Sequence, residues 1–239
     1  MDPIRLSLFI SKSGYTSRRK ADALIEEGKV EVNGTVVKEP FFRVNQDDKV
    51  KVCGKSLDTG RGKVYIVFNK PEGVTTTVED KFAERKVVDF LPAKFKGIFP
   101  VGRLDKNSSG LLILTNDGDL CYRLTHPKFR VEKEYIVRVS GLVKADDCLR
   151  AKKGLVDEGE HLKVEAIRII KSEEQTTVCN VIVCEGKKRH IRRLFRGLGF
   201  PVLELKRIRI GGLRLGDLKP GEYREVMKEV IEKNKPDSS

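Results

Sequence analysis

Apolar residues recur every three or four positions over residues 6–12 and again over residues 18–27, a spacing that predicts two short helices. Ser17 is placed to cap the second helix, and Gly28 is placed to end it. Valines then alternate with polar residues around Asn33 and Gly34, a pair that favours a tight hairpin turn. This pattern predicts a compact N-terminal module of two helices and a hairpin.

Strand patterns predominate beyond residue 63. They cover residues 64–71, 110–118, 131–139, 164–171, 176–184 and 202–213. Helical patterns cover residues 144–154 and 187–199, and the second has an apolar stripe formed by Ile191, Leu194, Phe195 and Leu198. Because strands and helices do not alternate in a regular repeat, we predict an α+β domain built on a largely antiparallel sheet.

The chain therefore divides into two predicted domains, residues 1–60 and residues 64–235. The polar stretch at residues 58–63 is the predicted linker between them. A length of 239 residues suits one small and one medium domain.

The chain is strongly basic, with 48 lysines and arginines against 35 acidic residues and a net charge of +13. This surplus favours a polyanionic partner, and no apolar span, signal peptide or broad amphipathic helix points to a membrane. Residues 187–214 hold ten of the basic residues and one acid, a local charge of +9. A solvated face is the ordinary interpretation, but the apolar stripe fixes the helix in place, so we predict a phosphate-binding surface. Its members are Lys187, Lys188, Arg189, Arg193, Arg196, Lys206 and Arg207.

The cysteines and histidines predict no metal site. Five scattered cysteines without a C-x-x-C pair do not form a disulfide framework, and the three histidines are far apart in sequence. We expect reduced cysteines, a cytoplasmic location and a monomer. A catalytic cysteine stays open as an alternative, although no cysteine here lies in a nucleophile motif.

Residues 4–37, IRLSLFISKSGYTSRRKADALIEEGKVEVNGTVV, resemble the small RNA-binding domain known as the S4 domain. The shared features are a helix, a basic entry to a second helix, and a hairpin. The resemblance implies that Lys12, Arg18, Arg19 and Lys20 face RNA. Basic side chains at a helix N-terminus support this, because they add charge to free backbone N–H donors. A generic module of two helices and a hairpin is the alternative.

Four motifs of the second domain resemble the RsuA-like family of ribosomal pseudouridine synthases. The stretch VGRLDKNSSGLLILTNDGDL is similar to that family's G-R-L-D loop and following strand, and YIVFNKPEGVTT is similar to its N-K-P-x-G turn. EKEYIVRV resembles its K-x-Y segment, and residues 185–213 resemble its basic helix and closing strand. Four motifs in the right order are more specific than any one of them. The resemblance spans about residues 3–229 and implies the pseudouridine synthase fold.

The resemblance implies an isomerase of uridine in RNA, which needs neither metal nor organic cofactor because the reaction involves no hydrolysis and no redox change. Asp105 matches the catalytic aspartate, although an aspartate in such a loop, taken alone, is more often a turn residue. Its role as nucleophile or as base stays open. Arg192 matches the arginine expected to pair with it. Tyr135 matches the tyrosine that packs on uracil, although a tyrosine in an alternating strand is more often a core residue.

The other implied roles concern the substrate. Arg103 is a candidate to fill the gap left by a flipped uridine, or to bind phosphate or brace the loop. We predict ribosomal RNA, free or in an assembly intermediate, as the partner, and the segment LTHPKFRVEKEY favours the large subunit. Small-subunit RNA, tRNA and a non-catalytic role in ribosome assembly are the alternatives. His190 stands where the family has glutamine, which leaves the local hydrogen bonding open.

Overall fold

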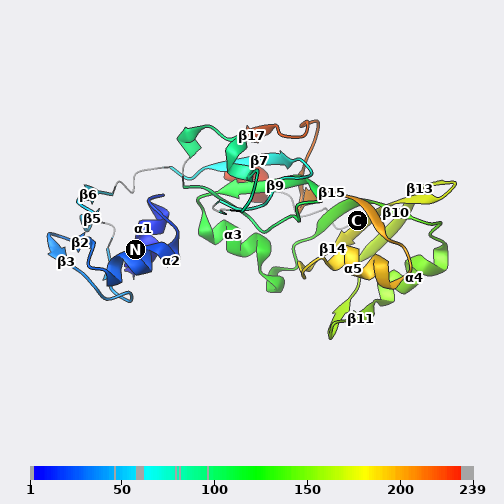
Figure 1. The fold of residues 1–239 in the computed structure, drawn as a ribbon, viewed down its shortest axis with the longest axis horizontal. Coiled ribbons are helices and arrows are strands. Elements are labelled where there is room, and N and C mark those ends of the chain that lie inside the picture. The colour runs from blue at the N-terminus through cyan, green and yellow to red at the C-terminus, as the bar shows by residue number, and fades with distance from the viewer. Residues whose placement is uncertain are drawn as a thin grey trace. The chain divides into compact units, whose positions relative to one another are not determined.

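The computed structural model describes residues 3–45, 47–57, 62–78, 80, 82–95 and 97–232. Most of the predicted linker, residues 58–61, lies outside the described residues. The chain forms two compact units (Figure 1). The first comprises Met1–Val64 with Pro92–Phe99, and the second comprises Tyr65–Leu91 with Pro100–Ser239.

The first unit contains the predicted helices and hairpin. Helices α1 (Leu6–Lys12) and α2 (Arg18–Glu26) are followed by a four-stranded sheet in the order β3 (Thr35–Val36), β2 (Val30–Val32), β5 (Val50–Val52), β6 (Lys55–Ser56). Strands β1 (Ile4–Arg5) and β4 (Arg43–Val44) form a separate pair. The Ser17 side chain caps α2 by accepting from the backbone N–H of Lys20, as predicted. Asn33 and Gly34 have positive φ angles of 52° and 86°, which the hairpin turn requires.

A short segment distant in sequence also belongs to the first unit. Residues Pro92–Phe99 cluster with it and include the short helix η2 (Ala93–Phe95). Gly97 packs so closely on Gly14 that an added Cβ would lie 2.6 Å from the Gly14 Cα. Phe95 and Ile98 are buried. The first unit therefore includes residues that the contiguous division at residues 58–63 assigned to the second domain.

A nine-stranded mixed sheet forms the centre of the second unit, as predicted. Its main order is β13 (Ala166–Glu173), β14 (Thr176–Val183), β10 (Lys133–Ser140), β15 (Val202–Ile210), β9 (Ser109–Thr115), β7 (Tyr65–Lys70), β17 (Tyr223–Glu225). Strands β8 (Phe99–Pro100) and β16 (Leu213–Arg214) pair with β9 and β15. Along the main order β15 and β9 are a parallel pair, and the other neighbouring strands of that order, together with β15 and β16, are antiparallel.

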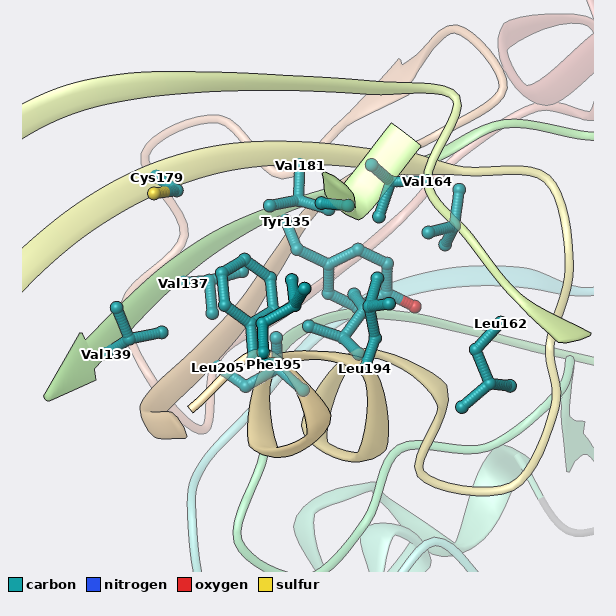
Figure 2. Packing of buried hydrophobic residues seen from close by; sticks show 14 of the residues in the cluster. Tyr135, Val137, Val139, Leu162, Val164, Cys179, Val181, Leu194, Phe195 and Leu205 are labelled. Atoms are coloured by element: carbon teal, nitrogen blue, oxygen red, sulfur yellow. The ribbon is translucent and has the colours of Figure 1, made fainter. Parts of the chain in front are cut away.

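Helix α5 (His190–Gly197) packs on the β10 and β14 side of the sheet. Its predicted apolar stripe is buried, and Figure 2 shows Leu194 and Phe195 against the strand residues Tyr135 and Val181. The predicted helix started at residue 187, but Arg189 has a positive φ of 52° and α5 begins only after it. Helix α4 (Ala145–Lys153) lies on the same core through Ala151. The hairpin of β11 (Leu155–Asp157) and β12 (Glu160–Leu162) adds Leu162 to this core.

Helix α3 (Gly118–Thr125) was not predicted. It follows β9 directly, and the side chain of Asp117 caps it by accepting from the backbone N–H groups of Asp119 and Leu120. Leu120 packs with the residues of β7 and β9 in a second core. The sequence signal was the Asp in N-D-G-D, which is a good helix cap as well as a turn residue. The remaining short elements are η1 (Val87–Phe90), η3 (Pro127–Phe129) and α6 (Lys228–Glu232).

Candidate active site

The strand register brings four residues into one row across the sheet. Lys70 of β7 is paired with Gly110 of β9, Gly110 with Arg207 of β15, and Arg207 with Tyr135 of β10. Directly paired residues share a face of the sheet. Asp105 lies one turn before β9, and its carbonyl accepts from the Ser108 backbone N–H at 3.0 Å. The loop that carries Asp105 therefore ends beside this row, where β9 starts.

The Asp105 loop, residues 104–108, is held by hydrogen bonds to its backbone. The hydroxyl of Thr76 donates to the carbonyl of Leu104 at 2.7 Å and accepts from the Leu104 N–H at 3.2 Å. The ammonium of Lys70 donates to the carbonyl of Ser108 at 2.7 Å. Among the described residues, no donor is bound to the Asp105 carboxylate, which is half-buried. The loop is thus fixed while its carboxylate stays available.

Gly110 permits the close approach of the two parallel strands beside this loop. Its φ is +102°, and a Cβ placed there would lie 2.2 Å from the carbonyl oxygen of Arg207. Only glycine adopts this backbone conformation with the partner strand so near. The glycine of S-S-G-L-L therefore sets the distance between the Asp105 loop and β15.

Lys70 is a buried cation beneath the loop. It is fully buried, and besides Ser108 it donates to the carbonyl of Pro71 at 2.8 Å. Burial lowers the pKa of Lys70 to about 8, and the negative charges of Glu72 and Asp105 oppose that shift. Sequence reasoning did not select Lys70, although it stands in the quoted N-K-P-x-G motif.

Arg192 also contacts the loop, but not in the way we predicted. Its guanidinium donates to the backbone carbonyl of Asn107, to the Ser108 hydroxyl at 3.4 Å and to the Val202 carbonyl at 3.2 Å. The described contacts include no direct ion pair with Asp105. Burial lowers the pKa of Arg192, and the charge of Asp105 opposes this, so the two groups interact at longer range. The guanidinium instead donates to backbone carbonyls, including that of Asn107 in the loop, which would otherwise lack donors.

Tyr135 belongs both to the core and to the site. Its ring is buried among Val181, Leu194 and Phe195 (Figure 2), and it also lines the cleft that contains Asp105. Its hydroxyl lies 3.5 Å from a guanidinium nitrogen of Arg207. The two interpretations of Tyr135 given by the sequence, core residue and site residue, are therefore compatible.

Arg207 is a buried cation that faces the cleft. It is 3% exposed, and its Nε donates to the carbonyl of Leu111 at 2.8 Å. Its Nη2 is buried without a hydrogen-bond partner among the described residues. A buried donor without a partner is costly, so this nitrogen is suited to an acceptor from a bound molecule.

The cleft beside the Asp105 loop has a volume of about 580 Å³, within the range of small-molecule sites. Its lining includes Thr76, Arg103, Asp105, Lys133, Tyr135, Lys187, Lys188, Arg189, His190 and Arg207. Burial and the nearby charge of Arg207 lower the pKa of Lys133 to about 8, and Lys133 was missed although it belongs to the K-x-Y motif. Asp105 and Glu185 are the two acidic residues in the described lining of this cleft, and the other charged residues there are basic.

The residues of the predicted phosphate-binding set lie in different places. Lys187, Lys188, Arg189 and Arg207 line the cleft, whereas Arg196 is exposed outside it and lies 3.5 Å from Asp157. Lys206 alternates with Arg207 along β15, so its side chain points to the opposite face of the sheet.

The prediction for Arg193 requires correction. Its side chain is 7% exposed and is enclosed by the carboxylates of Asp157 and Glu160, with Nε 2.5 Å from the Asp157 carboxylate. These carboxylates raise the pKa of Arg193 above its usual value. A guanidinium already neutralised in this way has little left to offer a phosphate. Arg193 instead ties α5 to the β11–β12 hairpin.

His190, which stands where the resemblance predicts a glutamine, belongs to the cleft. It is the first residue of α5, it lines the cleft and it is buried. Burial lowers the pKa of His190, which favours the neutral imidazole.

The predicted RNA-binding residues of the first unit are all at its surface. Lys12 is in the last turn of α1, and Arg18, Arg19 and Lys20 form the first turn of α2. Among the described residues, no carboxylate pairs with Lys12, Arg18 or Arg19. Across the described part of the chain, no group of histidine, cysteine and carboxylate side chains is arranged to hold a metal ion. No helix in that part is both long and apolar enough to span a bilayer.

Comparison with known proteins gives one consistent result. Residues 64–196 match the family described as RNA pseudouridylate synthase, and residues 4–50 match the S4 domain. An uncharacterized RNA pseudouridine synthase of Aquifex aeolicus is 41% identical over 95% of this chain and 91% of that protein. The ribosomal large subunit pseudouridine synthase B of Bacillus subtilis is 36% identical over 93% and 91%. A crystal structure of a pseudouridylate synthase matches 96% of this chain and 99% of that one, with a TM-score of 0.67 and 28% identity.

Proposed function

The chain belongs to the RNA pseudouridylate synthase family, and from that premise we propose that it isomerises a specific uridine in large-subunit ribosomal RNA with Asp105 as the catalytic carboxylate. The choice of substrate is supported by the Bacillus subtilis relative, which is named for the large ribosomal subunit. The single observation that supports Asp105 as the catalytic residue is the environment of its carboxylate. It is half-buried in a basic cleft, in a loop fixed through its backbone.

The reaction conserves all atoms of the uridine. The bond from ribose C1′ to uracil N1 breaks, the ring turns, and C5 bonds to C1′; a proton leaves C5 and one is taken up at N1. A carboxylate can start this sequence by attacking C1′ or by removing a ribose proton. Either role requires a carboxyl group whose oxygens are not already engaged, which fits Asp105, because no donor of a described residue is bound to it.

The residues around Asp105 would position the base. Tyr135, whose ring is largely buried but which also lines the cleft, is the candidate to pack against uracil. Arg207 lines the cleft and has one guanidinium nitrogen without a partner among the described residues, so it is the candidate donor to a uracil carbonyl or to a phosphate oxygen. Arg103, exposed at the rim of the cleft, is the candidate to fill the space left in the RNA when the uridine turns out of its stack.

The basic surfaces would hold the rest of the RNA. We assign phosphate contacts to Lys188 and Arg189 at the cleft, and to the exposed basic residues of α1 and α2 in the first unit. Lys187 also lines the cleft, but Glu185 already pairs with it at 2.5 Å, so it has less charge to offer a phosphate. The partner is ribosomal RNA, free or in an assembly intermediate, and the enzyme acts as a monomer in the cytoplasm.

The Asp105→Asn variant tests the proposed function. It keeps the size of the side chain and removes its charge, so we expect no detectable isomerisation and RNA affinity equal to or slightly above wild type. Single-turnover tritium release from RNA labelled at uracil C5 measures the first, and a filter-binding titration measures the second. Asp146→Asn, at an exposed site in the first turn of α4, is the matched control for loss of one negative charge.

The role of Asp105 and the class of substrate RNA are tested by separate measurements. Turnover of Asp105→Asn within tenfold of wild type is a barrier change below about 1.4 kcal/mol, too small for the reacting group. Chemical mapping of pseudouridine after incubation with large-subunit RNA, small-subunit RNA and tRNA identifies the substrate class. Modification of tRNA alone would overturn the ribosomal assignment but leave the role of Asp105 intact.

A further inference from the structure

Three aromatic rings form an exposed cluster where α3 ends and η3 begins. The cluster consists of Tyr122, His126 and Phe129, with ring centroids 4.8 Å apart for Tyr122 and His126 and 5.6 Å apart for Tyr122 and Phe129. Tyr122 and Phe129 are 47% and 41% exposed. Soluble proteins seldom expose adjacent large aromatic rings without a binding role. The cluster lies mostly in the LTHPKF segment, to which the proposed chemistry assigns nothing.

The backbone around the cluster is ordered by local hydrogen bonds. The His126 ring accepts from the Lys128 N–H at 3.2 Å, which caps η3, and the Thr125 hydroxyl donates to the Cys121 carbonyl at 2.6 Å. Arg130 then turns the chain with a left-handed conformation. Rings held in this way lose little freedom when a planar ligand binds.

The cluster is adjacent in sequence to residues that line the catalytic cleft. Leu124 and Thr125, on the same helix as Tyr122, line the cleft together with Asp105. A Cβ at Gly102, three residues before Asp105, would lie 3.5 Å from the Thr125 methyl group. A strand of RNA with its uridine in the cleft therefore has the cluster within reach of a neighbouring nucleotide.

The charge at the cluster suits a nucleotide rather than a protein side chain or a lipid. The Lys128 ammonium lies 5.0 Å from the Tyr122 ring centroid and 4.8 Å from that of Phe129, and no carboxylate of a described residue pairs with it. The neighbouring Arg123 and Arg130 are neutralised by Glu232 and Glu165. One free cation above aromatic rings can bind a phosphate while a base stacks on the rings.

We propose that the cluster of Tyr122, His126 and Phe129 binds an unpaired nucleobase of the substrate RNA beside the target uridine, with Lys128 on its phosphate. The inference rests on the proposed function, because it places this base relative to a uridine in the Asp105 cleft. Stacking accepts any base, so the cluster selects RNA with an unpaired base at a fixed distance from the target, not a particular letter.

Fluorescent substitution of the RNA tests the proposal. Stem-loops of a substrate RNA carry 2-aminopurine at one unpaired position at a time around the target, and stacking on an aromatic ring quenches its emission. We expect one position to be quenched by the wild-type enzyme and restored in Tyr122→Leu and in Phe129→Leu. Each substitution should weaken RNA binding about tenfold. Tyr122→Phe should keep both the quenching and the affinity.

Two controls fix the interpretation. Leu149→Ala removes an exposed apolar side chain from α4 and should change neither readout. Thermal melting establishes that each variant is folded, and Phe129→Leu provides an independent test if Tyr122→Leu is not. Equal quenching and affinity in wild type and both leucine variants would overturn the proposal. Failure of the wild-type enzyme to form pseudouridine in the same RNA would instead overturn the proposed function, and the two results are measured separately.

Discussion

Basic residues behave differently in the Asp105 loop and in the first turn of α2. At the loop, Lys70 and Arg192 are at least partly buried and donate to backbone carbonyls, so their charge is used inside the protein. At α2, Arg18 and Arg19 are exposed and have no acidic partner among the described residues. Residues of the same charge thus fix the loop of the proposed catalytic group in one region and remain available for a polyanion in the other. Burial and hydrogen-bond partners decide between the two roles.

The same contrast exists between neighbours on one helix. Arg192 and Arg193 are adjacent on α5, but Arg192 reaches the Asp105 loop while Arg193 is enclosed by Asp157 and Glu160. A helix turns about 100° per residue, so adjacent side chains leave it in different directions. Substituting each arginine in turn is therefore the strongest test of whether the two side chains have different roles.

We expect Arg192→Ala to lower kcat about 100-fold, because the loop loses a donor and small displacements of a reacting group have effects of that order. Arg192→Lys should recover little, since an ammonium cannot span the Asn107 and Val202 carbonyls as the planar guanidinium does. Single-turnover rates at saturating RNA are the measurement. A change in RNA affinity with an unchanged rate would contradict the positioning role.

Arg193→Ala is the matched variant on the same helix. It leaves the carboxylates of Asp157 and Glu160 without their cation, so we expect a lower melting temperature. Turnover of the folded fraction should stay within a few-fold of wild type. Weaker RNA binding without any loss of stability would restore the phosphate-contacting role that the sequence predicted for Arg193.

The sequence predicted most of the fold because each element has a local cause. Ser17, the Asn33–Gly34 turn and the apolar stripe of α5 act within a few residues, and each is found in the structure. That the segment 92–99 clusters with the first unit could not be predicted, because its place depends on a contact with Gly14, some eighty residues away. Long-range packing of that kind leaves no periodic pattern to detect.

The site was predicted less completely for a similar reason. Motifs identified Asp105 and Tyr135 as candidates, and the structure places both at one cleft. Lys70 and Arg207 join them through the register of four strands, which no single motif contains. The environment of Arg193 depends on the β11–β12 hairpin, which the sequence did not predict. Spacing along the helix could therefore not reveal that this arginine already had partners.

Raising the pH should distinguish the two regions, because it should deprotonate the buried lysines before the exposed arginines. The pKa of Lys70 is about 8, and deprotonation removes the positive charge beneath Asp105 and one loop donor. We expect kcat/KM on a short RNA to fall above pH 8 and to be about tenfold lower at pH 9. Lys133 has a pKa in the same range, so Lys133→Met identifies the source: the alkaline limb persists if Lys70 causes it.

The free energy of unfolding should rise with pH above pH 8, whereas kcat/KM falls. The pKa values of Lys70 and Lys133 are lower in the folded chain than in the unfolded chain, where the lysine value is 10.5. Between pH 8 and that value the unfolded chain binds more protons, so these lysines raise the free energy of unfolding as the pH increases. A melting temperature that falls in parallel with activity between pH 8 and 9 would mean that unfolding, not deprotonation beside Asp105, causes the loss.

The exposed arginines of α2 should give the smallest effect, and one of a different kind. Removing one phosphate-binding side chain lowers the log–log slope of affinity against salt by about 0.7 for single-stranded RNA, about a two- to threefold change between 50 and 200 mM salt. We expect this from Arg18→Ala and from Arg19→Ala, with unchanged single-turnover rates at saturation. Point variants are preferable to removal of residues 1–60, which would strip Pro92–Phe99 of the unit they pack in.

Lys171 provides the control for these arginines. It is exposed on β13, but Glu173 already neutralises it at 2.7 Å, so Lys171→Ala should leave the salt slope unchanged. If Arg18→Ala and Lys171→Ala have the same slope as wild type, the exposed charge of α2 does not touch RNA. The basic residues of the two regions would then differ in burial alone, and those of α2 would have no RNA-binding role. If Lys171→Ala lowers the slope as much as Arg18→Ala, the effect reports total charge and not a specific interaction with phosphate.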